Sequence, residues 1–399
     1  MIQPILLFAS WIVYLYSLAS ALYLAVMAVA GKTTRQVVFG SNPVKKRMAV
    51  LIPAYREDAV IIDTVEKALA HNYPGEFFKV IVIADSLKPE TIQVLNKTTA
   101  MVLQVNFELS SKAGSIRAAL QVTDRDMFDV AVLLDADNIM TAGCLETINN
   151  AFHNGSLAVQ CHRVAKNRNT PVALLDALSE EININLFRRG PAALGLSAAP
   201  MGSGMAFDFP LFKAIFAHNR MPGNPAEDRE IEIQLMLKGI RMNFLENALV
   251  LDEKVANGRS FETQRTRWLE AQMNHVARFF NPDVQAAAKN GNYFNQLIRN
   301  LILPRLMFLM LFALVITLFV LQKLLQIKLV YPSMQAWALC ITTYLAALFI
   351  SVPAGFYRVA TLKAILYLPV LIFRMGGALV KMKRNRKEFL HTNKTFTTK

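Results

Sequence analysis

The sequence predicts an α/β protein, in which a mostly parallel sheet with helices on both faces is joined to transmembrane and interfacial helices. Two observations predict this class. In the middle of the chain, short apolar runs alternate with helical stretches, as in proteins whose strands are mostly parallel. At the amino end, no charged side chain occurs between Met1 and Gly31, a run longer than the roughly 20 residues that span a bilayer.

The middle of the chain can be divided into strands and helices by its apolar pattern. Strands are expected at 48–55, 79–85, 129–137 and 157–164, and helices near 57–71, 88–98, 111–122 and 141–153. The first three strands are nearly continuous apolar runs, which is typical of strands covered on both faces. Such sheets bind ligands beyond the carboxyl ends of their strands, where Asp85 and Asp135 lie.

The composition indicates which kinds of partner and cofactor the protein is expected to have. Of 399 residues, 54% are apolar and 18% are charged, below the roughly 25% of soluble proteins. The net charge of +14 suits anionic lipid or an anionic substrate. Nucleic acid is not expected as a partner, because the basic residues flank apolar segments and no aromatic recognition motif accompanies them. The three cysteines are unpatterned and indicate neither a zinc site nor a disulfide framework.

The basic residues set the expected orientation in the membrane. Residues 1–31 are predicted to be an amino-terminal transmembrane helix; a signal peptide is disfavoured because the run is long and no Lys or Arg precedes it. Basic residues follow within 32–47, and such flanks stay cytoplasmic. Residues 46–290 are therefore expected to form a cytoplasmic domain of an integral protein of a bacterial inner (plasma) membrane.

The carboxyl-terminal part, 293–381, is expected to hold interfacial and transmembrane helices. Its apolar stretches are 301–321, interrupted by Arg305, then 334–353 and 364–380, and a surface helix is expected around 295–304. The tail 382–399 is basic, which is a cytoplasmic signal. Because three full crossings would place this tail outside, we expect the last stretch to be interfacial or re-entrant.

Asp135 and Asp137 form a DxD pair directly after an apolar strand. Two carboxylates one residue apart can approach one hard cation if the turn bends them together, and Mg²⁺ or Mn²⁺ takes oxygen ligands together with substrate phosphate. The simpler alternative is that Asp often ends a strand and starts a turn. Several carboxylates at strand ends in one domain favour the metal site.

Further motifs extend this pattern along the chain. They are IPAYRED at 52–58, Asp85, the DxD pair, Glu227-Asp228 and QRTRW at 264–268. In this order they resemble the family 2 glycosyltransferases, whose fold is called GT-A, and the last is similar to the QxxRW box of cellulose, chitin and hyaluronan synthases. The resemblance covers about 48–280 and implies a nucleotide-activated sugar donor, expected to be a UDP-sugar.

The resemblance implies a set of donor-binding residues: Pro53, Tyr55, Glu57, Asp85, Lys112, Asp135, Gln264, Arg267 and Trp268. Asp85 would contact the base. Glu57 has an alternative as an acid in the first turn of a helix, favoured by the helix dipole. Lys112 has an alternative as a solvated lysine at a helix start. Gln264, Arg267 and Trp268 share one helix face by their spacing, whereas Arg265 is expected to point elsewhere into solvent.

The resemblance also implies the catalytic and acceptor residues. Asp228 would be the base, with Glu227 beside it; Ala226 replaces the hydroxyl residue that usually precedes this pair. The alternative is that the two acids start a helix. The acceptor would meet Gly202, Ser203, Gly204 and Trp268. A loop that needs positive φ is the alternative for the glycines. Gln160 and His162 could point into the same cleft, or be structural.

The tail FLHTNK at 389–394 is similar to the gating loop of bacterial cellulose synthase. Phe389, Thr392 and Lys394 would fold over the bound nucleotide as a lid; a basic tail held to anionic lipid is the alternative.

The sequence thus predicts an inverting transferase that moves a sugar from a UDP-sugar to a growing polysaccharide or lipid-linked glycan at the cytoplasmic membrane face. The alternatives are a single-sugar transferase acting on a membrane lipid, similar to ceramide glucosyltransferase, and a non-catalytic membrane subunit. A homo-oligomer and an export partner both stay open.

Overall fold

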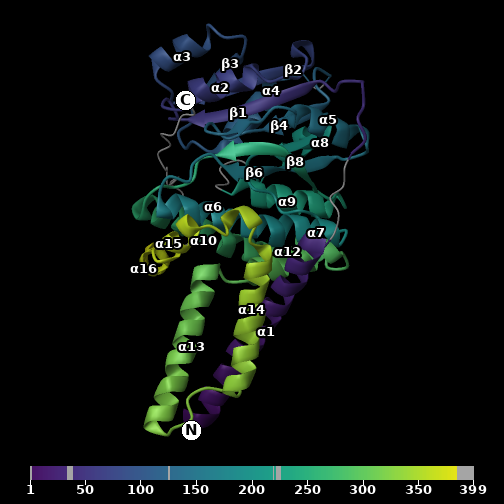
Figure 1. The fold of residues 1–399 in the computed structure, drawn as a ribbon. Helices are drawn as coiled ribbons and strands as arrows, with labels where there is room; N and C mark the ends of the chain where they lie inside the picture. Colours follow the sequence, from purple (N-terminus) through teal and green to yellow (C-terminus); the bar gives the residue numbers. More distant parts are fainter. Residues whose placement is uncertain (1, 34–38, 125, 219, 222–225, 384–399) are drawn as a thin grey trace.

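A domain built on one sheet stands on a bundle of long apolar helices (Figure 1). The computed structural model describes residues 2–33, 39–124, 126–218, 220–221 and 226–383. Figure 1 shows helices α1, α13 and α14 projecting from the base of the domain, with α15 and α16 lying across that base.

In the described part of the chain, the sheet has eight strands in the order β3-β2-β1-β4-β7-β6-β8-β5. The strands are β1 Met48–Tyr55, β2 Phe78–Asp85, β3 Met101–Val105, β4 Val130–Leu133, β5 Ile139–Met140, β6 Ala158–Ala165, β7 Met205–Asp208 and β8 Asn243–Asp252. The pairs β3–β2, β2–β1, β1–β4 and β6–β8 are parallel, whereas β7 is antiparallel to both its neighbours and β5 to β8. The predicted α/β class with a mostly parallel sheet is confirmed.

Both faces of the sheet are covered because alternate residues of its central strands point to opposite sides. Val50 and Ile52 of β1 belong to an apolar cluster with α2 Ile61–Leu69 and α5 Cys144–His153. Ala49 and Leu51 belong to a second cluster with α4 Lys112–Val122 and α8 Phe209–Phe216.

Further helices complete the domain. They are η1 Gly75–Phe77, α3 Pro89–Leu95, α6 Pro171–Ile184, the π-helix η2 Asn185–Arg189, α7 Gly190–Ala193, α9 Glu227–Leu237, α10 Gly258–Arg278, α11 Pro282–Gln285 and α12 Gly291–Leu301. The predicted strand over 129–137 is shorter than expected, since β4 ends at Leu133 and the DxD pair lies in the turn that follows.

Among the residues that the structure describes, three helices are long and apolar enough to cross a membrane: α1 Ile2–Thr33, α13 Arg305–Leu325 and α14 Met334–Ser351. The last apolar stretch follows the short helix η3 Ala354–Phe356 and forms two helices, α15 Val359–Ile365 and α16 Leu368–Lys381. These two helices meet at an angle of 47°, and together they would make a fourth crossing if they were counted as one span. In Figure 1 this pair lies at the base of the domain beside α10. Arg305 does not interrupt a helix, because Pro304 caps α13 and Arg305 begins it.

Candidate active site

The carboxyl ends of β1, β2 and β4 bring the first motifs together at one edge of the sheet. Tyr55 is in register with Asp85 at the ends of β1 and β2. Leu51 is in register with Leu133, so that the DxD turn after β4 emerges beside the end of β1. Ligands of mostly parallel sheets bind at such an edge.

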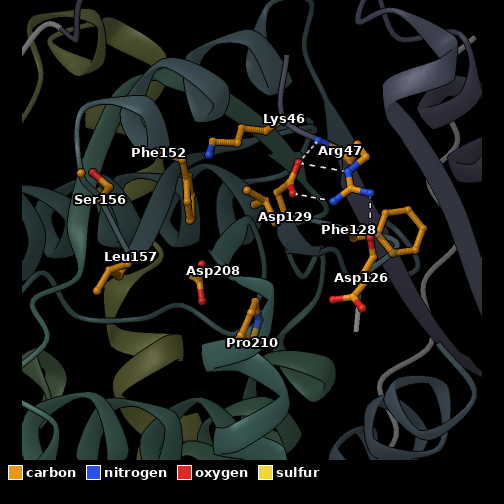
Figure 2. Close-up of a pocket in the computed structure, with 12 residues that line it drawn as sticks. Lys46, Arg47, Asp126, Phe128, Asp129, Phe152, Ser156, Leu157, Asp208 and Pro210 are labelled. Carbon is orange, nitrogen blue, oxygen red and sulfur yellow. Dashed lines mark hydrogen bonds and ion pairs between the residues drawn. The ribbon is translucent and has the colours of Figure 1, made fainter. Parts of the chain in front are cut away.

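A cavity of about 390 Å³ lies at the opposite edge, where β1 and β4 begin (Figure 2). Lys46, Arg47 and Asp208 line it, and Arg47 pairs with Asp129 at 2.9 Å. The motif residues do not line this cavity, so it is not the candidate site.

Asp85 is buried, with 1% of its surface exposed, at the end of β2. The Ser86 hydroxyl donates to one carboxylate oxygen at 2.9 Å. The other oxygen, Oδ2, is buried and has no hydrogen-bond partner among the residues that the structure describes. An unsatisfied buried acceptor is costly, so an N–H group of a ligand would stabilise this oxygen. Arg56 and Ser86 have φ values of 56° and 58°, an uncommon backbone conformation that is typical of functional sites.

Lys112 lies at the centre of the candidate site. Its ammonium group donates to Asp135 Oδ1 and to the carbonyl oxygen of Gly202, both at 2.5 Å, and pairs with Glu227 Oε1 at 3.2 Å. Burial alone lowers the pKa of Lys112, but attraction to Asp135 and Glu227 outweighs it and raises the pKa above the usual value. The alternative of a solvated lysine is wrong, since three separate segments meet at this side chain.

Glu227 and Asp228 form the first turn of α9, so the helix-start interpretation and the site interpretation coexist. Burial raises the pKa of Glu227 in spite of the Lys112 ammonium beside it. A Cβ atom added to Gly202 would lie 3.9 Å from Asp228 Oδ2, which places this carboxylate beside the predicted acceptor turn.

The predicted acceptor turn is also a turn that requires glycine. Gly202 and Gly204 have φ values of 81° and 63°, where other residues are strained. Ser203 Oγ accepts a hydrogen bond from the backbone N–H of Asp135 at 2.9 Å and donates to Asn138 Oδ1 at 2.5 Å. The turn is therefore fixed against the DxD segment.

Gln160 supports this turn from behind and does not line a cleft. Its side chain is fully buried, accepts from the backbone N–H of Met201 at 2.8 Å, and donates to the carbonyl oxygens of Ser203 and Gly204 at 3.0 and 3.1 Å. The interpretation of Gln160 as a cleft residue is wrong, because all of its polar atoms are used by backbone groups.

His162 is likewise structural. It is buried, and its two ring nitrogens lie 3.2 Å from carboxylate oxygens of Glu181 and Glu246. Burial alone lowers the pKa of His162, but the interactions with these two acids outweigh it and raise the pKa to about 9. The ion pairs use both nitrogens, which leaves the ring no role in the Lys112 cluster.

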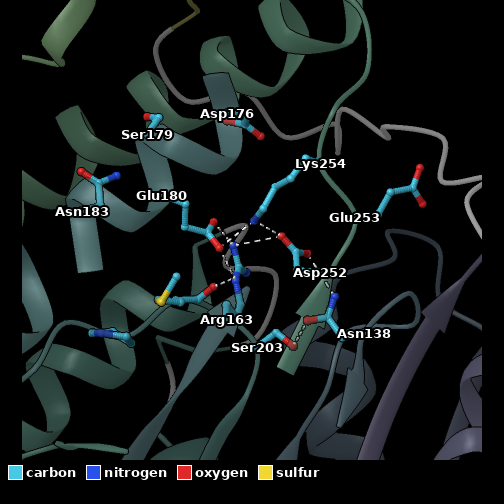
Figure 3. A network of polar contacts seen from close by, with 12 residues as sticks. Asn138, Arg163, Asp176, Ser179, Glu180, Asn183, Ser203, Asp252, Glu253 and Lys254 are labelled. Atoms are coloured by element: carbon cyan, nitrogen blue, oxygen red, sulfur yellow. Dashed lines mark hydrogen bonds and ion pairs between the residues drawn. The ribbon is translucent and has the colours of Figure 1, made fainter. Parts of the chain in front are cut away.

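A buried group of charges braces the acceptor turn, and no sequence motif marked it (Figure 3). Asn138 donates to Asp252 at 3.0 Å, and the Lys254 ammonium lies 2.6 Å from both Asp252 and Glu180. Arg163 pairs with Glu180 at 2.7 Å and donates to the carbonyl oxygen of Met201 at 2.9 Å. The group joins the DxD turn, β6, β8 and α6 in one network around residues 201–204.

The QRTRW segment lies on α10. Burial lowers the pKa of Arg267, although the negative charges of Asp135, Glu227 and Asp228 act on it in the opposite direction, so this guanidinium lies within electrostatic reach of the site. Gln264 Oε1 is buried and has no hydrogen-bond partner in the described part of the chain. Trp268 keeps 36% of its surface exposed.

Arg265 is not solvated, contrary to the expectation from helical spacing. It forms an ion pair with the buried Asp176 of α6, and its guanidinium lies over the ring of Trp268. Only 11% of its side chain is exposed, so this position is covered by protein.

Comparison with known proteins identifies the family. Residues 46–271, more than half of the chain, match the family described as "Glycosyltransferase like family 2". The chain is a family 2 glycosyltransferase. No curated protein sequence matches the chain.

Solved structures resemble this glycosyltransferase over most of its length. The mannosyltransferase PcManGT from Pyrobaculum calidifontis, in complex with GDP-Man and Mn²⁺, has a TM-score of 0.53 at 16% identity, covering 92% of this chain and 95% of that one. S. aureus TarS 1–349 has a TM-score of 0.44 at 13% identity, covering 85% and 93%. The first likeness supports the predicted GT-A fold; the narrower resemblance to cellulose, chitin and hyaluronan synthases stays a prediction.

The DxD turn of the glycosyltransferase suits a divalent metal held with help from its substrate. Asp135 is partly exposed at the site, and Asp137 is buried, with Oδ2 accepting from the backbone N–H of Glu253 at 3.4 Å. Within the described residues, no cluster of three or more His, Cys, Asp or Glu side chains could hold a metal. Two carboxylates fit Mg²⁺ or Mn²⁺, which are bound through one or two carboxylates together with substrate phosphate and water.

The remaining predicted residues of the transferase fall into two groups. Pro53 and Tyr55 belong to β1, and Glu57 follows it; Glu57 precedes α2, which begins at Ile61, so it is not in the first turn of that helix. The gating residues Phe389, Thr392 and Lys394 lie outside the described residues.

Proposed function

We propose that this glycosyltransferase moves a sugar from a UDP-sugar to a growing polysaccharide or a lipid-linked glycan, with inversion at the anomeric carbon. One observation carries the proposal: Lys112 links Asp135, Gly202 and Glu227, so the predicted donor, acceptor and catalytic segments meet at one side chain. Asp228 and Arg267 belong to the same group of charges.

The nucleoside would bind at the ends of β1 and β2. The unpartnered oxygen of Asp85 can accept a hydrogen bond from a base N–H group. Uracil and guanine both offer such a donor. Guanine is included because PcManGT was determined in complex with GDP-Man. UDP is our choice from the resemblance of the motifs, and the test below includes both nucleotides.

Asp135 and Asp137 would hold Mg²⁺ or Mn²⁺. When bound, the metal neutralises charge on the diphosphate leaving group. PcManGT was solved with Mn²⁺, which is in keeping with this assignment. Lys112 and Arg267 add positive charge in the same cluster, and an arginine can meet diphosphate oxygens with two parallel hydrogen bonds.

Asp228 would act as the base. As the acceptor oxygen attacks the anomeric carbon, its proton passes to the Asp228 carboxylate, while the bond between that carbon and the diphosphate oxygen breaks. The electron pair leaves with the diphosphate. Because the attack and the departure occur on opposite sides of the carbon in one step, the configuration is inverted. The acceptor would lie between the turn at 202–204 and the indole of Trp268.

The acceptor is expected at a membrane surface, and two helices favour this. Phe294, Ile298 and Leu301 form one exposed apolar stripe on α12, whose polar face is buried against the domain. On α16, Phe373 and Val380 are exposed while Leu371 and Met375 are buried. Helices of this kind lie in the interface plane of a bilayer. We therefore propose that 293–381 is the interfacial and transmembrane part. The basic residues within 32–47 support our proposal that residues 46–290 lie at the cytoplasmic face of a bacterial inner membrane.

The decisive experiment is to offer the purified protein, in membrane lipid, a panel of UDP- and GDP-sugars and to weigh the products. A ladder of masses is expected from one UDP-sugar; a single added sugar would favour the transferase acting on a membrane lipid. Absence of nucleotide release with every donor would leave only the non-catalytic subunit. EDTA should abolish transfer and added Mn²⁺ or Mg²⁺ should restore it, whereas full activity in EDTA would overturn the metal assignment.

A further inference from the structure

Arg265 is held in one position by contacts on two elements. On α10 itself, its guanidinium carbon lies 4.7 Å from the ring centroid of Phe261 and 4.1 Å from that of Trp268. These rings lie four residues before and three residues after Arg265, so both occupy its side of the helix. Only 11% of the Arg265 side chain is exposed.

The second holding contact crosses to another helix. Arg265 Nη2 donates to Asp176 of α6 in a buried ion pair. A charge taken out of water needs a partner, and Asp176 supplies it. The carboxylate sets where the guanidinium plane lies, and the plane in turn covers part of the Trp268 indole.

Trp268 is left with a restricted orientation and an open surface. Its indole contacts the guanidinium, yet 36% of the residue stays exposed. An aromatic ring that is held in place loses less conformational freedom when it binds a sugar. Arginine suits this task better than lysine, because its flat guanidinium stacks on a ring while its N–H groups meet a carboxylate.

We propose that Arg265 is a positioning residue that fixes the Trp268 indole for the acceptor sugar, and that Asp176 fixes Arg265. The inference rests on the proposed role of Trp268 in acceptor binding. It gives α6, which already braces the acceptor turn through Glu180, a second link to the acceptor side of the site. A plain alternative is that the ion pair only fastens α10 to the domain.

The chain offers a matched control for that alternative. Arg374 of α16 donates to Glu262 of α10 at 3.1 Å, so this pair also fastens α10 to a neighbouring helix. It does not involve Trp268. The variants are therefore R265K, which keeps the charge but loses the flat stack, D176N, which removes the carboxylate charge, and R374K as the control.

Kinetics with varied acceptor give the first readout. R265K should lower kcat/KM for the acceptor roughly 3- to 30-fold, the size of a cation–π contact, because lysine cannot stack a flat group on the indole while it also meets the carboxylate. D176N should also lower kcat/KM for the acceptor. Binding of UDP and Mn²⁺ should be unchanged in both variants, and R374K should match the wild type in all respects.

Fluorescence gives a second readout that needs no turnover. The chain has three tryptophans, Trp11, Trp268 and Trp337, so W11F/W337F leaves Trp268 as the reporter. R265K in this background should shift the emission of Trp268, and R374K should not. Equal kinetics in R265K and R374K, or unchanged Trp268 emission in R265K, would overturn the inference. If the wild type transfers no sugar, the proposed function fails instead, and the emission readout still judges whether Arg265 positions the ring.

Discussion

The candidate site balances its charges through a few side chains that each have several partners. Lys112 and Arg267 supply positive charge, and Asp135, Glu227 and Asp228 supply negative charge. The two hydrogen bonds of Lys112 at 2.5 Å restrict the movement of the DxD turn and the acceptor turn relative to each other. Single substitutions that keep the shape but change the charge are therefore the most informative.

Asp228→Asn tests the base. The variant should bind nucleotide as the wild type does, but its transfer rate should fall by at least about 100-fold, because an amide cannot take the acceptor proton. The rate under saturating donor and the nucleotide affinity by calorimetry check this. Asp283→Asn, at a half-exposed ion pair with Arg278, is the control and should be near wild type. Substantial turnover by Asp228→Asn would remove this residue as the base.

At the scale of elements, the contact between α1 and the π-helix region joins the apolar bundle to the domain. Asn185 of η2 donates to the carbonyl oxygen of Ala28 at 3.1 Å and to Ser351 Oγ of α14 at 3.0 Å. Gly31 and Gly190 allow the two backbones to approach closely. Small residues permit such approach between helices, so this contact depends on them.

Gly190→Ala should separate α1 from α7. Its Cβ would overlap the carbonyl oxygen of Met27, a backbone atom that cannot turn aside. We expect a loss of about 1–3 kcal/mol in the free energy of unfolding, seen as a lower midpoint of thermal unfolding in detergent. Gly376→Ala is the control, because a Cβ there meets nothing within 4 Å, and it should be neutral or slightly stabilising. Equal midpoints for the two variants would contradict the close packing.

Around His162, four elements are joined by buried charges, and this makes stability depend on pH. His162 of β6 pairs with Glu181 of α6 and Glu246 of β8, and Glu246 also pairs with Arg189 of η2. Arg189 and His162 outweigh the effect of burial and lower the pKa of Glu246 to about 2. Because the pKa of His162 is raised from 6.5 to about 9, its contribution is complete below pH 6.5 and is lost as the pH rises through 9.

The free energy of unfolding should thus fall by up to about 3 kcal/mol between pH 6.5 and 9.5. His162→Gln should be less stable at pH 6.5 and should lack most of this fall. Denaturant unfolding of both proteins across the pH range checks the prediction. An equally steep fall in His162→Gln would show that another group is responsible.

On the scale of the whole molecule, one sheet domain stands on a small apolar bundle (Figure 1). The ends of α1 and α14 that meet η2 lie at the base of the domain; α1 also contacts α12, and α16 lies across another part of the same base. This arrangement brings the candidate acceptor side, which includes α10, next to the surface where an apolar bundle would enter a bilayer. A lipid-linked acceptor would have a short path to it.

The orientation can be tested with sealed vesicles. Basic residues within 32–47 predict that residues 46–290 face the cytoplasm. Protease added to right-side-out vesicles should leave this domain intact, and protease added to inverted vesicles should cut it. A tag at the amino terminus is the control and should be removed only from right-side-out vesicles. Cleavage of the domain in right-side-out vesicles would reverse the orientation.

The sequence by itself determined the class of fold, the DxD turn and the apolar helices, because each depends on local pattern and length. Strand alternation, the uncharged run from Met1 to Gly31 and the motif order can all be read without knowing any contact. The strands β3, β5, β7 and β8 were not predicted, since short or half-buried strands have weak local patterns.

Only the tertiary structure decided which side chains act together. Three hydrogen bonds join residues that are far apart in the sequence: Lys112 and Gly202 are separated by 90 residues, Asn138 and Asp252 by 114, and Arg265 and Asp176 by 89. No local pattern encodes such pairs, because the sheet order and the helix packing choose the partners. For the same reason Gln160, His162 and Arg265 received roles from the fold that their own neighbours in the sequence did not indicate.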